Sequence, residues 1–150
     1  MLNALAEVNE ILKQTGAEVS THHAASVTEE NRMEIGLNVQ KSIFGEAIDH
    51  AYENSPKNQL HIQKYLSGLC FGDFYTRKIL DVRMRELITF CCIASLGGCE
   101  NQLKAHIIAN EKVGNSKEML VDAITQCILY IGFPRTLNAL SCINEMMKES

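Results

Sequence analysis

The stretch that decides the fold is Leu96-Gly97-Gly98-Cys99-Glu100-Asn101-Gln102-Leu103-Lys104-Ala105-His106. Its two glycines separate an apolar helical pattern from a second helical pattern, which predicts two helices joined by a short turn. In the second helix Cys99, Gln102 and His106 stand at positions i, i+3 and i+7 and share one side. A thiol, an amide and an imidazole on one side of a helix suit acid–base or thiol chemistry.

The segments on either side of this turn have the pattern of capped helices. Asp81 is an N-cap for an apolar helix from 82 to about 96, and Ser116 is an N-cap for a helix over 117–131. Gly132-Phe133-Pro134 breaks that helix and opens a last one. The helices over 83–96 and 117–131 are apolar on more than one stripe, which indicates burial in a homo-oligomer.

The N-terminal part of the chain has weaker helix signals. Apolar spacing predicts a helix from Leu2 to about Thr15, and the small polar residues that follow predict a linker over 17–27. Further elements are expected at Thr28 (as N-cap) to about 44, at 46–52 and after Ser55-Pro56, with a connecting loop over 71–75. Without strand alternation, we expect an N-terminal helix and linker (1–27) and one all-α domain (28–150).

Composition excludes several classes of partner. The chain has 150 residues, 46% of them hydrophobic and 21% charged, which suits one globular domain. A net charge of −4 without a Lys/Arg block argues against nucleic acid and anionic membranes. The apolar runs are too short to span a bilayer, and no signal peptide is evident. The six cysteines are therefore expected to be reduced and mostly buried, in the cytoplasm.

No pattern of metal or nucleotide binding is present in the sequence. Paired Cys-x-x-Cys or His-x-x-x-His spacing and glycine-rich phosphate loops are missing, so we expect no metal and no cofactor. The remaining candidates for chemistry are a histidine and a carboxylate, His106 and Glu86, that exchange protons with a small-molecule substrate. Arg77 and Arg85, close in sequence to Tyr75, are candidates for holding a substrate carboxylate, although ordinary surface charge is the more common reason for such arginines.

An ordered set of motifs resembles the carboxymuconolactone decarboxylase family. The set comprises residues 71–77, Arg85-Glu86-Leu87-Ile88-Thr89, 96–106, Val113-Gly114-Asn115, Gln126, 130–134 and Asn138-Ala139. This resemblance implies an all-α, alkylhydroperoxidase D-like bundle with a central helical hairpin, assembled into trimers or hexamers. It also implies one of two activities: decarboxylation of 4-carboxymuconolactone without a cofactor, or reduction of peroxides by a Cys-x-x-Cys dithiol.

The resemblance assigns roles to individual residues. Glu86 matches the family's upstream acid, Cys99 the first cysteine of the dithiol and His106 the histidine, while Gln102 replaces the second cysteine. That replacement favours the decarboxylase branch, with Arg77 or Arg85, Gln102 and Tyr75 at the substrate. Two alternatives stay open. One is a thiol peroxidase that uses Cys99 with a resolving thiol from Cys91, Cys92 or a partner subunit. The other is a non-catalytic relative that keeps the fold.

Overall fold

The computed structural model describes residues 2–17 and 24–148, and over these ranges the chain is all-helical, without a β-strand. The helices, in chain order, are α1 (Leu2–Gln14), α2 (Arg32–Phe44), α3 (Ala47–Glu53), α4 (Leu60–Tyr65), the π-helical segment η1 (Leu66–Phe74), α5 (Val82–Leu96), α6 (Glu100–Lys112) and α7 (Lys117–Met146). The all-α prediction is confirmed.

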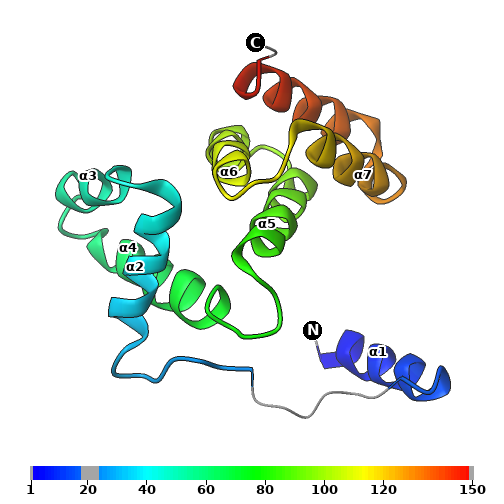
Figure 1. Cartoon of the computed structure of the whole chain (residues 1–150), viewed down its shortest axis with the longest axis horizontal. Helices are drawn as coiled ribbons and strands as arrows, with labels where there is room; N and C mark the ends of the chain where they lie inside the picture. The colour runs from blue at the N-terminus through cyan, green and yellow to red at the C-terminus, as the bar shows by residue number, and fades with distance from the viewer. Residues whose placement is uncertain (1, 18–23, 149–150) are drawn as a thin grey trace.

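Two groups of helices form the body of the molecule (Figure 1). Helices α5, α6 and α7 pack against one another, and α2 packs against η1 with α3 and α4 beside them. Helix α1 lies apart from both groups (Figure 1). The linker predicted over 17–27 includes residues 18–23, which lie outside the described residues, so the domain boundary at residue 27 stays a prediction.

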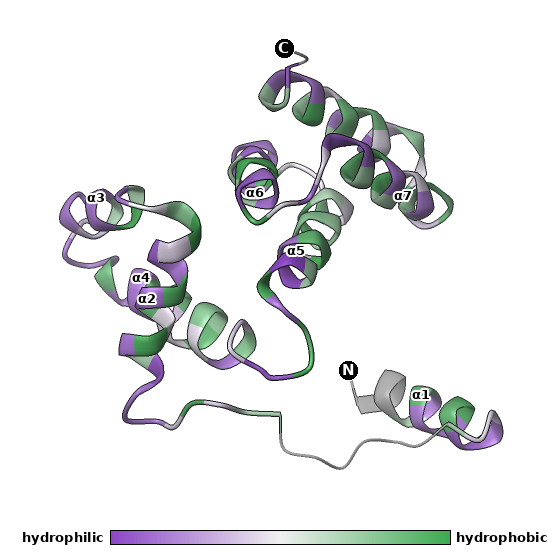
Figure 2. Ribbon diagram, in the orientation of Figure 1, coloured by the Kyte–Doolittle hydropathy of each residue, from purple (hydrophilic) through white to green (hydrophobic). Residues whose placement is uncertain are grey.

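Each group has its own buried core. Phe90, Ile107, Leu120, Ile124 and Ile143 from α5, α6 and α7 are fully buried in one cluster. The other cluster joins Ile43 of α2, Phe71 of η1 and Tyr75 to Ala109 of α6. Because α6 contributes to both clusters, it connects the two groups. In Figure 2 the first turn of α5 is hydrophilic and the rest of that helix is largely hydrophobic.

The predicted helix ends around the central turn are confirmed. The Asp81 carboxylate accepts a hydrogen bond from the backbone N–H of Met84 at 2.8 Å, and the Ser116 hydroxyl accepts one from Met119 at 3.2 Å. Gly97 ends α5 with a φ of 70°, a left-handed conformation that glycine adopts without strain. At Gly132 α7 kinks, with a φ of 74°, as the Gly132-Phe133-Pro134 break predicts.

The loop predicted over 71–75 is wrong, because η1 continues to Phe74. Its glycines explain the missed helix. A Cβ on Gly36 of α2 would lie 2.0 Å from the Ser67 carbonyl oxygen and 2.6 Å from the Gly72 nitrogen, so the two backbones touch. Backbone contact replaces the apolar side-chain period that normally reveals a buried helix. Two predicted helix starts are also too early: the helix expected from Thr28 begins at Arg32, and the helix expected after Ser55-Pro56 begins at Leu60.

Several large apolar side chains are solvent-exposed on α5 and α7 of the single chain. They include Leu96 (69% exposed), Leu129 (88%), Tyr130 (88%) and Phe133 (67%). Exposed apolar surface of this kind is typical of a protein–protein interface, and trimeric or hexameric assembly stays a prediction. Among the helices of residues 2–17 and 24–148, none combines the length and the apolarity needed to cross a membrane.

Candidate active site

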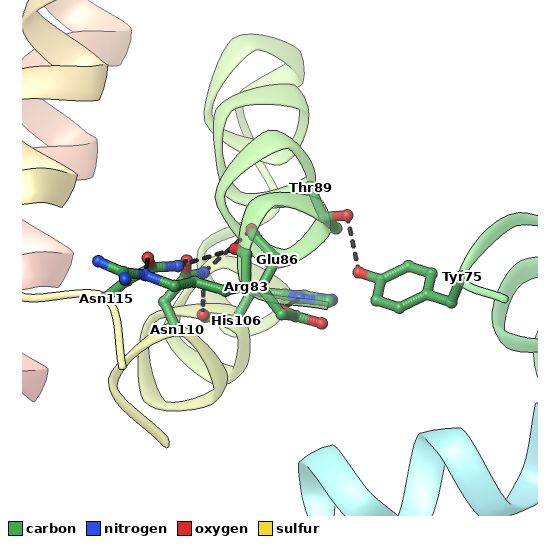
Figure 3. A network of polar contacts seen from close by, with 7 residues as sticks. All are labelled: Tyr75, Arg83, Glu86, Thr89, His106, Asn110 and Asn115. Carbon is green, nitrogen blue, oxygen red and sulfur yellow. Dashed lines mark hydrogen bonds and ion pairs between the residues drawn. The ribbon is translucent and has the colours of Figure 1, made fainter. Parts of the chain in front are cut away.

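A buried carboxylate and a histidine form the centre of the site (Figure 3). Oε2 of Glu86, on α5, lies 2.7 Å from Nδ1 of His106, on α6. The Glu86 side chain is 0% exposed and the His106 side chain is 15% exposed. The structure therefore brings together the two residues that the sequence offers as candidates for proton exchange.

This contact determines which ring nitrogen of His106 is free to meet a bound molecule. A carboxylate is an acceptor, so Nδ1 of His106 donates to it, and Nε2 is the ring nitrogen left for a bound molecule. The ring of Phe44 meets the ring of His106 edge-on, with 5.3 Å between the centroids, and restricts its rotation. The pair can therefore take or give a proton at Nε2 while Glu86 balances the charge on the ring.

A chain of buried amides clamps the two helices where the pair lies. Nδ2 of Asn110 donates to the backbone oxygens of Glu86 at 3.0 Å and of His106 at 2.7 Å. Its Oδ1 accepts from Nδ2 of Asn115 at 2.7 Å, and Oδ1 of Asn115 accepts from Nε of Arg83 at 2.8 Å (Figure 3). These bonds hold the backbones of the acid and the histidine, and so set the distance between their side chains.

Tyr75 lies on the other side of the pair. Its hydroxyl is 2.7 Å from the hydroxyl of Thr89 (Figure 3). Burial raises the pKa of Tyr75 well above its ordinary value; the Thr89 hydrogen bond lowers it, and the Glu86 charge raises it further. Tyr75 is therefore a neutral hydrogen-bonding group at physiological pH.

A cavity of about 390 Å³ lies between the two groups of helices, with His106 in its wall. Its lining is mainly apolar and includes side chains from α2, α3, η1, α5 and α6. The lining residues are Gln40, Phe44, Ile48, Leu66, Cys70, Phe71, Thr89, Ile93, Leu96, Cys99, Gln102, Ala105 and His106. Leu66, Leu96 and Gln102 are solvent-exposed, so the cavity opens on their side. A small, largely apolar molecule fits this shape and chemistry.

The structure places the predicted site residues in two different regions. His106, Cys99 and Gln102 line the cavity, and Glu86 and Tyr75 stand directly behind it. Neither Arg77 nor Arg85 is among the described lining residues. The guanidinium of Arg85 donates instead to the backbone oxygens of Leu80, at 3.0 Å, and of Arg77.

The thiols are divided in the same way. Cys70 shares the cavity with Cys99, and burial raises the pKa of the Cys70 thiol, with a further increase from the Glu86 charge. Cys91 and Cys92 line a separate apolar hollow between α5 and Ala123 of α7. Burial raises the pKa of Cys91 to about 12. Among residues 2–17 and 24–148 no three His, Cys, Asp or Glu side chains are arranged to hold a metal ion.

Sequence reasoning missed Gln40 and Cys70 as members of the site. Gln40 is 3% exposed, and its Oε1 accepts a hydrogen bond from the Ser67 hydroxyl at 2.5 Å. Both residues reach the cavity only because α2 and η1 dock against α5 and α6. The signal that the sequence offers for Gln40 is a polar residue on the same helix face as Gly36 and Ile43.

The fold and this site together define a class of protein. The family model of the carboxymuconolactone decarboxylase family matches residues 61–145, more than half of the chain, and the chain belongs to this family. A curated relative is the 4-carboxymuconolactone decarboxylase of Acinetobacter baylyi. The two are 28% identical over 124 residues, which cover 82% of this chain and 92% of the relative.

Proposed function

We propose that this protein is a cofactor-independent lyase that removes CO2 from a small carboxylated lactone or a related acid. The observation that carries the proposal is the 2.7 Å contact between Glu86 and His106 at the wall of a largely apolar cavity of about 390 Å³. The name of the Acinetobacter baylyi relative supports the same reaction. A cytoplasmic location belongs to this proposal and is a prediction.

The chemistry divides between the apolar lining and the histidine. In the reaction the bond between the carboxylate carbon and the ring breaks, and its electron pair moves into the conjugated system of the lactone as an enolate. The carboxylate loses its charge as CO2 forms, so surroundings such as Leu66, Ile93 and Phe71 disfavour the reactant more than the transition state. The protonated ring of His106, which keeps its Nδ1–H on Glu86, then donates its Nε2–H in the place of CO2, and the ring afterwards regains a proton from solvent.

The other residues position these groups. Glu86 holds the imidazole in the tautomer and orientation that the proton transfer needs. Thr89, backed by Tyr75, and Gln102 at the mouth of the cavity supply neutral hydrogen bonds to the lactone. Cys99 lies at the start of α6 and lines the cavity beside Gln102. Arg77 and Arg85 could hold a carboxylate only outside the cavity of this chain.

The test is CO2 release from carboxyl-labelled unsaturated lactones. The wild type should release labelled CO2, His106→Ala should lose at least about a hundredfold in kcat, and Glu86→Gln should show a smaller loss with an altered pH profile. A matched control is the surface pair of His50 and Glu53, whose Nδ1 and Oε2 lie 3.6 Å apart and whose side chains are 70% and 71% exposed. His50→Ala and Glu53→Gln should leave the rate unchanged. Full activity in His106→Ala would refute the proposal.

A thiol peroxidase is the second candidate, because Cys99 and Cys70 line the same cavity as His106. In that reaction the Cys99 thiolate attacks a hydroperoxide, an alcohol leaves and Cys99 becomes a sulfenic acid; Cys70 then displaces water to form a disulfide. Peroxide treatment followed by peptide mass spectrometry tests it. A Cys70–Cys99 disulfide that disappears in Cys99→Ser would support this candidate, and unmodified Cys99 would exclude it.

A further inference from the structure

Two thiols outside the His106 cavity lie on helices that pack against each other. Cys91 is on α5 and Cys127 is on α7, and both side chains are partly buried against the core that α5, α6 and α7 share. Neither residue is among the described residues that line the cavity of His106. The proposed lyase reaction therefore does not use these two thiols.

Helix periodicity places the two thiols where α5 and α7 meet. Leu87 and Cys91 of α5 line an apolar hollow together with Ala123 of α7. Cys127 follows Ala123 by four residues, so it lies about one turn further along the same side of α7. Cys91 and Cys127 are therefore neighbours across the contact between the two helices.

The titration of Cys91 indicates the same proximity. Burial is the main cause that raises its pKa to about 12, and the charge of Cys127 and a hydrogen bond with Cys127 raise it further. A hydrogen bond between two side chains requires their sulfur atoms to lie close together. Cys92 is solvent-exposed, and its charge is the smallest cause of the raised pKa. The partner of Cys91 is thus Cys127 and not its neighbour in the sequence.

The apolar hollow gives a small molecule access to this pair. Its volume is about 600 Å³, and Cys91 is part of its lining. Ile88, Cys92 and Leu96 also line the hollow and are solvent-exposed, so the hollow opens on their side of α5. A reagent of low molecular weight can therefore approach the pair without entering the His106 cavity.

We propose that Cys91 and Cys127 form a redox-active dithiol, which a low-molecular-weight disulfide converts into a disulfide bond between α5 and α7. The Cys127 thiolate attacks one sulfur of the small disulfide, and the other sulfur leaves as a thiolate and takes up a proton. Cys91 then loses its proton and attacks the sulfur of Cys127, and the second small thiol leaves. The two protein thiols are oxidised, and the small disulfide is reduced to two thiols.

The order of these steps follows from the environment of Cys91. Because its pKa is about 12, Cys91 is almost entirely protonated at neutral pH, and Cys127 is the thiol that attacks first. Once the sulfur of Cys127 is bonded to the small molecule it carries no charge, so it no longer raises the pKa of Cys91. The inference does not rest on the proposed function, since it concerns no residue of the His106 cavity.

The test maps the bond in the reduced, folded protein. The protein is incubated with oxidised glutathione at pH 8, free thiols are blocked with N-ethylmaleimide, and the chain is digested with trypsin without reduction. Trypsin releases residues 86–104, which carry Cys91, Cys92 and Cys99, and residues 118–135, which carry Cys127. We expect the two peptides to be joined by a bond that tandem mass spectrometry assigns to Cys91 and Cys127. The oxidised chain should migrate as a single copy on a non-reducing gel.

Three results of this experiment would overturn the inference. The first is that Cys91 and Cys127 are both found blocked by N-ethylmaleimide, which is the behaviour of thiols that only pack as small apolar side chains. The second is a bond to Cys127 that runs through Cys92 or Cys99. The third is a bond between two copies of the chain.

Variants and stability give a second measurement. Cys127→Ala should abolish the joined peptides, whereas Cys92→Ala, at the exposed neighbour, should leave them unchanged. The bond should raise the urea midpoint of the wild type by about 1 M, and the oxidised and reduced midpoints of Cys127→Ala should coincide. Equal midpoints for the oxidised and reduced wild type would contradict a bond that joins α5 to α7. If Cys127→Ala fails to fold, the peptide map of the wild type still decides.

The lyase and the dithiol fail in different ways. His106→Ala should lose CO2 release and still form the bond between Cys91 and Cys127 at the wild-type rate. Release of CO2 from a protein whose Cys91 and Cys127 stay free would refute the dithiol and keep the lyase.

Discussion

Asn110→Ala should destabilise the protein by far more than an ordinary surface substitution. The Asn110 side chain, on α6, is fully buried. It donates to the backbone oxygens of Glu86 and His106, and it accepts from Asn115. Alanine removes all three hydrogen bonds and adds none.

The expected magnitude follows from these bonds. A buried hydrogen bond contributes about 1 kcal/mol net, so three bonds give about 3 kcal/mol. The backbone oxygens of Glu86 and His106 retain their helical partners, and Asn115 retains its bond to the Arg83 carbonyl oxygen at 2.9 Å, so no further orphaned group adds to the loss. The space that the amide leaves adds a smaller cost.

Urea unfolding measures this loss, with Asn101→Ala as the matched control. Asn101 lies on the same helix and is solvent-exposed, so its replacement should change the free energy of unfolding by less than about 0.5 kcal/mol. In Asn110→Ala the midpoint should fall with an unchanged m-value. A loss below about 1 kcal/mol, or one equal to that of the control, would refute the idea that the amide clamps the two helices.

Three further changes test the packing, the thiols and a cap. Gly36→Ala places its Cβ 2.0 Å from a backbone oxygen of η1, so it should lower the melting temperature sharply. Gly68→Ala is the control, because its Cβ meets no atom nearer than 3.8 Å and the protein should fold normally. Equal melting temperatures of the two variants would contradict the backbone contact at Gly36. Burial raises the pKa of Cys91 to about 12, so almost none of this thiol is thiolate at pH 8. Iodoacetamide should therefore label the exposed Cys92 before Cys91, as followed by peptide mass spectrometry. Labelling in the reverse order would contradict the raised pKa of Cys91. Asp81→Ala removes the N-cap of α5 and should cost about 1 kcal/mol in urea unfolding, and an unchanged midpoint would argue against the cap.

Local signals explain the parts of the fold that the sequence predicts well. Asp81 and Ser116 cap their helices through their own side chains, and Gly97 and Gly132 break the helical backbone by themselves. The sequence also points to Glu86 and His106 as candidates through local signals. Each residue lies on a helix with a strong pattern, and a short turn joins the two helices.

The residues that the sequence does not place depend on contacts between distant segments. Gln40 becomes a site residue only when α2 docks on η1, and this docking uses backbone contact at Gly36 instead of an apolar stripe. Arg85, in contrast, does not line the cavity, because local backbone contacts hold its side chain. Its guanidinium finds acceptors on the backbone just before α5, and charge spacing alone does not reveal that choice.

The burial of the Glu86 carboxylate is better explained by a role in chemistry than by a contribution to stability. Its carboxylate is fully buried, and its Oε1 has no hydrogen-bond partner among the described residues. Removing a carboxylate from water costs several kcal/mol, and one contact with His106 does not recover all of it, whereas an apolar side chain of similar volume would carry no such cost. Asn110 binds the backbone oxygen of Glu86 and leaves the carboxylate unsatisfied. A residue that costs stability and at the same time orients an imidazole toward a cavity has the profile of a functional group, and this is the strongest physical reason to look for proton transfer at His106.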